Sequence, residues 1–423
     1  MPAPLLTARR LAAARDIAAV LVFCGLVLLG GRAVLEAPFF QKERLTSAEA
    51  AGDIDRFYSE LETYRPGGLT AAERARYDAA RSSAAAQAAA ARDEFGRITM
   101  RDLAWTLCLA AASTGDESTA VLWRPQRKWK DPAQKFPPFT LALRSGRLTV
   151  DRSLDPALRG AELLELGGKP AETFLAPVLQ RIPGATAPYR AYMFCRAQDV
   201  WWDFSGLLEG APGVGARFRT ADGRQLARNT PPITGGEFRR LGWTAPLQGG
   251  RLYAHRQAGW LAPDGLADSR AWRRRTRAFF GTLENGGITL LVIDLRDAPA
   301  GNMRAAQELL RLTGGWLKQG GRRAALLTGP GSGSAAAAFA QGFRDMKAGE
   351  ILGEPTGGTP GHPGAPRTLR LPASGIYFTV PTRSYPGSGL PVVPDVALHG
   401  PPPGYRGDLA SYVLELLAQS KAR

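Results

Sequence analysis

The amino-acid sequence predicts an α/β fold for its C-terminal part, preceded by a helical region and a β-rich region. Two observations predict the α/β part. Residues 288–295 form a nearly all-apolar run, which is typical of a strand that is buried on both faces of a sheet. Apolar residues at helical spacing follow, and the order of strand and helix repeats from residue 324 onwards. The loops after such strands are the expected place for a site.

The chain is long enough for two or three folded units, because 423 residues exceed one ordinary core. Its 44% hydrophobic and 22% charged residues are typical of globular proteins. The formal net charge of +16 comes mainly from scattered arginines. The densest cluster, Arg273 to Arg275 with Arg277, is short and reads as a solvated basic helix face. No nucleic-acid partner is therefore expected.

Residues 1–40 are predicted to be a cytoplasmic tail and a membrane anchor. Arg9, Arg10 and Arg15 precede an uncharged run over residues 17–31, which can be extended to Leu35 to reach the length of a membrane span. A cleaved signal peptide is the alternative. The positive-inside rule puts the N-terminus in the cytoplasm. We therefore expect a single-pass protein of a bacterial inner membrane with its bulk in the periplasm.

The remaining chain divides into three predicted regions. Residues 41–135 are expected to be helical, with helices near 47–64, 70–95 and 99–112. Residues 136–238 are expected to be β-rich, because short strands alternate with turn signals such as Ser145-Gly146. A PDZ-like domain is one interpretation of this region. Residues 239–423 are expected to form the α/β core, which ends in a helix after Asp408.

Cysteine and histidine give no metal signal. Cys108 and Cys195 can either pair in an oxidising compartment or remain two buried thiols. The three histidines are far apart in the sequence, and no metal or other cofactor is expected: His255, His362 and His399.

Residues 326–335, LLTGPGSGSA, carry the strongest functional signal. An apolar strand, a glycine-rich turn, a serine and an alanine-rich helix follow one another there. This order puts the Ser334 hydroxyl at a helix N-terminus, beside free backbone N–H groups and the positive end of the helix dipole. Such a serine serves either as a nucleophile with an anion hole or as a simple helix cap.

An ordered set of short motifs resembles the C-terminal processing, or tail-specific, serine protease family, in the branch with tricorn-core and retinoid-binding-protein-like members. The resemblance implies a crotonase/ClpP-like protease core and covers most of the chain from about residue 46. The motifs are TGDEST at 114–119, the strand and turn at 160–170, DLRDAPAGN at 294–302, GSGSA at 331–335, GEPTGG at 353–358 and Pro394-Asp395.

The resemblance assigns Ser334 as the nucleophile, and Gly301 and Ala335 to the oxyanion pocket. It also shows departures from the family at both positions of the general base. The lysine of one branch corresponds to Thr359, and the histidine of the other branch corresponds to Ser118.

Substitute bases can be named from the sequence. His362 follows the lost lysine in a loop and is the candidate base, with Glu354 as the residue that would orient it; an exposed loop histidine and a turn residue are the plainer interpretations. Asp116 and Glu117 flank the vacant Ser118, but carboxylates of ordinary pKa are weak bases for serine.

Three functions follow for this chain. The first is a serine peptidase that hydrolyses peptide bonds of extracytoplasmic polypeptides through Ser334. The second is a catalytically inactive pseudoprotease that binds peptides or serves as a scaffold. The third is an unrelated α/β protein in which Ser334 only caps a helix. The sequence does not predict an oligomeric state.

Overall fold

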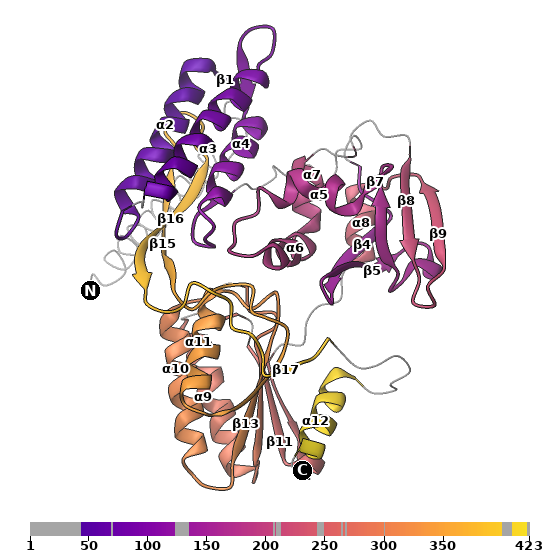
Figure 1. Ribbon diagram of the computed structural model, residues 1–423, viewed down its shortest axis with the longest axis vertical. Coiled ribbons are helices and arrows are strands. Elements are labelled where there is room, and N and C mark those ends of the chain that lie inside the picture. Colours follow the sequence, from indigo (N-terminus) through magenta and orange to yellow (C-terminus); the bar gives the residue numbers. More distant parts are fainter. Residues whose placement is uncertain are drawn as a thin grey trace, which may run out of the picture.

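The computed structural model describes residues 44–68, 71–122, 135–205, 208, 213–242, 249–263, 265–266, 269–299, 301–399 and 408–420. The predicted membrane anchor, residues 1–40, lies outside these residues. Within the described part, no helix has the length and apolarity that a membrane span requires. Figure 1 shows an N-terminal helical part, a β-rich part beside it and a C-terminal α/β part.

The C-terminal part is built on a six-stranded sheet, as the sequence predicts. The strand order is β10-β11-β12-β13-β14-β17; β10 is antiparallel to β11 and all other neighbours are parallel. A 3-10 turn, η4 (Ala254–Arg256), joins β10 to β11. The strands are β10 (Gly249–Tyr253), β11 (Ala258–Ala262), β12 (Leu290–Asp294), β13 (Arg323–Thr328), β14 (Gly349–Gly353) and β17 (Val396–Ala397).

Helices cover both faces of this sheet (Figure 1). On one face lie α9 (Arg270–Asn285), α10 (Met303–Leu317) and α11 (Ser334–Asp345), and on the other lies α12 (Leu409–Ser420). Alternate residues of β12 therefore enter two different cores: Leu291 and Ile293 pack towards the first face, and Leu290 and Val292 towards α12. This explains the continuous apolar run, because neither face of the strand meets water.

The β-rich part holds a sheet of order β4-β5-β6-β8-β9, with β7 pairing β6. The tight turns predicted at Ser145-Gly146 and within residues 160–170 join these strands. The elements are β4 (Phe139–Arg144), β5 (Arg147–Ser153), η3 (Pro156–Leu158), β6 (Glu162–Leu166), β7 (Lys169–Pro170), α5 (Ala171–Leu179), α6 (Ala187–Arg196), α7 (Gln198–Ser205), β8 (Val214–Arg219), β9 (Gln225–Thr230) and α8 (Gly235–Leu241). The PDZ-like interpretation stays a prediction.

The N-terminal part packs three helices over a small antiparallel pair, β1–β2. A capping box between Thr46 and Glu49 fixes the start of α2, so this helix begins where the sequence predicts. The elements are β1 (Arg44–Thr46), α2 (Ser47–Tyr64), α3 (Ala71–Ala90), β2 (Arg97–Thr99), α4 (Met100–Ser113) and β3 (Ala120–Leu122).

A long hairpin from the C-terminal region packs on the N-terminal helical part (Figure 1). Its strands, β15 (His362–Arg370) and β16 (Tyr377–Tyr385), belong to the C-terminal region in sequence, yet β16 pairs with β3 and packs against α2. The fully buried carboxylate of Asp53 accepts the N–H groups of Ala373 and Ser374 in the hairpin turn, at 3.0 and 2.7 Å. This contact locks the hairpin onto the helical part.

Two of the open alternatives are resolved by this packing. Cys108 and Cys195 are both free, buried thiols, and each belongs to a different hydrophobic core. The arginine cluster lies on the exposed side of α9, whose buried side carries Trp272, Thr276 and Phe280 among others. These arginines are exposed, as the predicted basic helix face requires, and the absence of a nucleic-acid partner stays a prediction.

Candidate active site

Three loops meet at the carboxyl ends of β12, β13 and β14, and hydrogen bonds to the loop after β13 hold them together. The Ser332 hydroxyl donates to the Leu295 carbonyl at 2.8 Å, which ties that loop to the one after β12. The Gly333 N–H donates to the Ala298 carbonyl at 2.9 Å, and the Gly358 N–H donates to the Ser332 carbonyl at 2.9 Å. The segment before Ser334 is therefore fixed on both sides.

Ser334 is the first residue of α11, and a glutamate from a distant loop binds it. Its hydroxyl donates to Glu117 Oε1 at 2.7 Å, and its backbone N–H donates to the same oxygen at 2.9 Å. The helix-capping residue, Gly333, has no side chain, so the carboxylate of Glu117 supplies the acceptor that a capping side chain would give. The sequence predicts Ser334 to be either a nucleophile or a helix cap. In the structure Gly333 is the capping residue, and both the hydroxyl and the N–H of Ser334 donate hydrogen bonds to the Glu117 carboxylate.

The environment of Glu117 changes its acidity. Burial of the carboxyl group raises its pKa from 4.5 to about 7, although the hydrogen bonds from Ser334 act in the opposite direction. Part of the residue's surface remains accessible, but its carboxyl group is enclosed by protein atoms. Glu117 therefore titrates close to neutral pH, and the expectation that its pKa is ordinary is wrong.

The loop that carries Glu117 is anchored by its neighbour. Asp116 accepts the N–H groups of Ser118 and Thr119 through one oxygen, both at 2.8 Å, and the Thr119 hydroxyl through the other at 3.0 Å. Arg65 pairs with the same carboxylate at 3.4 Å. Asp116 thus shapes the turn from which the Glu117 side chain reaches Ser334.

Tyr189 of α6 closes the site on the side of the β-rich part. Its hydroxyl donates to the Pro299 carbonyl at 2.7 Å, in the loop after β12. Burial raises the pKa of this phenol well above its usual value, and the nearby charge of Glu117 adds to the shift. Tyr189 is therefore a neutral hydrogen-bond donor that packs beside the carboxylate.

The two family base positions hold hydroxyls that donate to backbone carbonyls. Ser118 Oγ donates to the Pro363 carbonyl at 3.0 Å, and Thr359 Oγ1 donates to the Gly361 carbonyl at 2.9 Å. Neither hydroxyl is hydrogen-bonded to Ser334 in the described part of the chain. Both side chains thus link loop backbone together.

The structure does not join the predicted base and its predicted partner to Ser334. His362 Nδ1 lies 3.0 Å from the Pro360 carbonyl, its ring packs on Tyr385, and burial lowers its pKa. Glu354 Oε1 instead lies 3.1 Å from Nδ1 of His399. Among the residues described, neither His362 nor Glu354 has a hydrogen bond to Ser334. His255 is exposed on η4.

Gly301 and Ala335, the predicted oxyanion residues, lie against each other. A Cβ atom added at Gly301 would be only 2.8 Å from the Cβ of Ala335. Ala335 is in the first turn of α11, where N–H groups have no acceptor within the helix. Ala300, which precedes Gly301, lies outside the described residues.

Two glycines create the room for the carboxylate. A Cβ atom at Gly333 would lie 2.2 Å from the Pro299 carbonyl oxygen and 2.7 Å from Glu117 Oε2. A Cβ atom at Gly358 would lie 2.2 Å from the Ser334 nitrogen and 2.5 Å from Glu117 Oε1. Any larger residue at these positions would displace Glu117 or the loops.

Glu117 and Tyr189 are the two site residues that the sequence reasoning missed. Glu117 precedes the vacant histidine position, and that proximity was the available signal. A carboxyl group of ordinary pKa is a weak base for serine, and the burial that raises the pKa of Glu117 cannot be derived from the sequence. Tyr189 lies in a different predicted region and carried no signal.

Comparison with known proteins places this site in a known fold. No protein-family model matches the sequence, and a comparison with curated proteins found no match. Among solved structures, mature CPAF complexed with lactacystin is similar, with a TM-score of 0.54 and 13% identity over 89% of this chain and 98% of that chain. Mature CPAF alone gives 0.53 and 13% over 88% and 96%.

A photosystem II D1 C-terminal processing protease also matches, with a TM-score of 0.41 and 12% identity over 82% of this chain and 93% of that chain. At such identities the similarity shows the fold alone. The two CPAF structures, whose TM-scores exceed 0.5, share their fold with this chain, and the predicted α/β fold class is confirmed.

Proposed function

We propose that this protein is a serine peptidase in which Ser334 attacks the peptide carbonyl and Glu117 is its general base. The 2.7 Å hydrogen bond between Ser334 Oγ and Glu117 Oε1 is the observation that carries the proposal. A serine hydroxyl needs a positioned base, and a base works best when its pKa is near the working pH. The pKa of Glu117, raised to about 7 by burial, suits that task.

The proposed reaction follows from this pair. Ionised Glu117 takes the proton of the Ser334 hydroxyl as Oγ bonds to the substrate's carbonyl carbon. We assign the oxyanion that forms to the backbone N–H groups of Gly301 and Ala335. Protonated Glu117 then gives its proton to the leaving amine, and the peptide C–N bond breaks. Water then attacks the ester that remains on Ser334 and gives its proton to Glu117. The bond between the carbonyl carbon and Oγ breaks, Glu117 returns the proton to Oγ, and the acid product leaves.

The substrate class and location are further parts of the proposal. The ordered motifs that resemble the tail-specific proteases support a polypeptide substrate. The arginines before the uncharged run of residues 17–31 support a single membrane anchor with the peptidase outside the cytoplasm. Alkaline carbonate extraction of membranes, together with protease digestion of intact spheroplasts, tests this; release by carbonate or protection of the bulk of the chain would contradict it.

A pseudoprotease is the second candidate, and one observation favours it. Glu117 Oε1 accepts the Ser334 backbone N–H at 2.9 Å as well as the hydroxyl, so the carboxylate also stabilises the start of α11. A residue with that structural task would be kept in a chain that binds peptides without cleaving them. The two candidates differ in whether Ser334 reacts.

Reaction with a fluorophosphonate probe tests the proposed function. We expect covalent labelling that mass spectrometry maps to Ser334, and cleavage of unstructured polypeptides by the same preparation. Ser334→Ala should abolish both, and Ser82→Ala, at an exposed serine of α3, is the control and should leave both unchanged. Peptide binding without labelling would overturn the peptidase proposal and support the pseudoprotease.

A further inference from the structure

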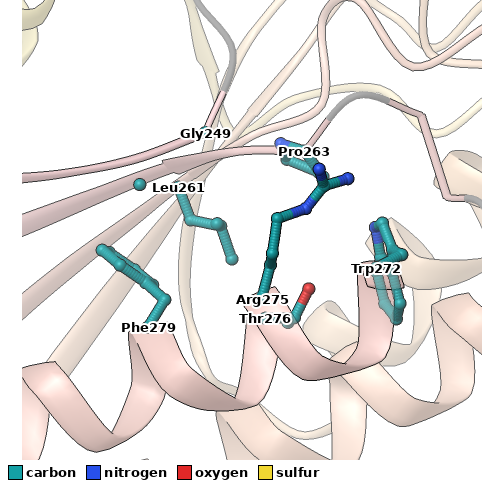
Figure 2. Close-up of a pocket in the computed structure, with 8 residues that line it drawn as sticks. Gly249, Leu261, Pro263, Trp272, Arg275, Thr276 and Phe279 are labelled. Carbon is teal, nitrogen blue, oxygen red and sulfur yellow. The ribbon is translucent and has the colours of Figure 1, made fainter. Parts of the chain in front are cut away.

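A separate cavity of about 290 Å³ lies between α9 and the edge of the C-terminal sheet (Figure 2). It shares no residue with the Ser334 site. Strands β10 and β11 form one side, and one face of α9 forms the other. Its lining residues are Gly249, Gly250, Leu261, Pro263, Trp272, Arg275, Thr276 and Phe279.

The larger part of the cavity wall is apolar. Leu261 and the ring of Trp272 are buried, and Phe279 closes the side next to β10. The backbone of β10 approaches this ring so closely that a Cβ atom at Gly250 would lie 2.2 Å from Phe279 Cδ2. The cavity therefore suits a hydrocarbon group better than a strongly hydrated ion.

Polar groups without partners accompany these apolar walls. Within the described part of the chain, neither the exposed guanidinium of Arg275 nor the hydroxyl of Thr276 has a hydrogen bond or ion pair. Figure 2 shows the Arg275 guanidinium and the Thr276 hydroxyl directed towards the same space, with Trp272 beside them.

Donors that line a cavity without a protein partner can bind an acceptor group of a ligand, and Arg275 and Thr276 supply such donors here. A guanidinium with free donors selects planar, negatively charged acceptors, and a carboxylate fits it bidentately. The apolar interior argues against inorganic phosphate or sulfate. A water molecule occupies ~30 Å³ in the liquid, so a cavity of about 290 Å³ has the volume of about ten waters. A ligand of about ten non-hydrogen atoms would fill it.

We propose that this cavity binds a carboxylate carried on a short apolar body. The carboxylate lies at the mouth on Arg275 and Thr276, and the apolar body lies inside between Leu261, Trp272 and Phe279. A medium-chain fatty acid and the C-terminal residue of a peptide with an apolar side chain share this chemistry. Binding does not involve Ser334, so this inference stands apart from the peptidase proposal.

Calorimetric titration of the full-length chain tests the inference. The probes are octanoate and N-acetyl-leucine, and their uncharged counterparts are octanamide and N-acetyl-leucinamide. We expect at least one carboxylate to bind, and its amide to bind about tenfold more weakly or worse, because hydrogen bonds to charged groups are the stronger ones. Tighter binding of octanoate would assign a fatty acid, and tighter binding of N-acetyl-leucine a peptide C-terminus.

Matched variants locate the binding. Arg275→Ala should weaken binding of the carboxylate at least about tenfold, and Arg275→Lys should weaken it less because the charge remains. Arg274→Ala is the control, since Arg274 is an exposed arginine of the same helix that does not line the cavity. The inference is overturned if neither carboxylate binds, if the amides bind equally well, or if Arg275→Ala binds like Arg274→Ala.

Discussion

Replacement of Glu117 by glutamine separates the catalytic from the structural part of the account. Glutamine has nearly the same shape and can still accept the Ser334 N–H through its amide oxygen, but it cannot take a proton. We expect the rate of fluorophosphonate labelling at about pH 8 to fall by about 10²- to 10⁴-fold, the usual contribution of general-base catalysis. The hydroxyl of Ser334 remains in place, so loss of reactivity reports on the base.

The same substitution should stabilise the protein at high pH. Because the pKa of Glu117 is raised from 4.5 to about 7 by burial, the folded chain binds this proton more tightly than the unfolded chain. The stability that depends on the protonated carboxyl is complete below about pH 4.5 and is lost as the pH rises through 7. The difference between these pKa values corresponds to about 3 kcal/mol as an order of magnitude.

Urea unfolding of the wild-type chain and of Glu117→Gln at about pH 4 and pH 8 measures this effect. The two proteins should be similar at the lower pH, and the variant should be more stable by up to about 3 kcal/mol at the higher pH. Glu94→Gln, at an exposed glutamate, is the control and should show no such change. The reasoning is refuted if Glu117→Gln keeps the wild-type labelling rate, or if its stability relative to wild type does not depend on pH.

Three further substitutions probe the surroundings of the pair. Gly333→Ala introduces a Cβ atom 2.7 Å from Glu117 Oε2, so labelling should fall at least tenfold and unfolding free energy by about 1–3 kcal/mol; wild-type behaviour in both assays would contradict the packing. His362→Ala should leave the labelling rate within about twofold, whereas a large loss would restore His362 as the base. Asp53→Ala leaves two N–H groups of the hairpin turn without their acceptor, which should cost about 2–5 kcal/mol and expose the β15–β16 hairpin to proteolysis; an unchanged urea midpoint would argue against this lock.

Local patterns predicted the elements well, because each depends on residues close in the sequence. The apolar run at 288–295 became β12, and the helix predicted at 47–64 became α2 with the same bounds. Ser334 was found because a strand, a glycine-rich turn and a helix follow one another within a few residues. Such signals need no knowledge of tertiary packing.

Local sequence patterns could not identify Glu117 as the proposed base of Ser334, for two physical reasons. Glu117 is 217 residues away in the sequence, and only the packed fold brings its carboxyl to the serine. Its acidity depends on burial, so an unperturbed pKa gave the wrong assessment. The pairing of β16 with β3 is a further long-range contact of this kind, because it joins segments about 260 residues apart that only the packed fold brings together.

The pH dependence of labelling at Ser334 tests the central claim most directly. The second-order rate constant for a fluorophosphonate, measured between about pH 5 and 9 with the modified residue identified by mass spectrometry, should rise and level off with a midpoint near the pKa of Glu117, about 7. Below that pH the carboxyl is protonated and cannot accept the serine proton. Absence of labelling across this range, or a rate that does not change through pH 7, would contradict the account.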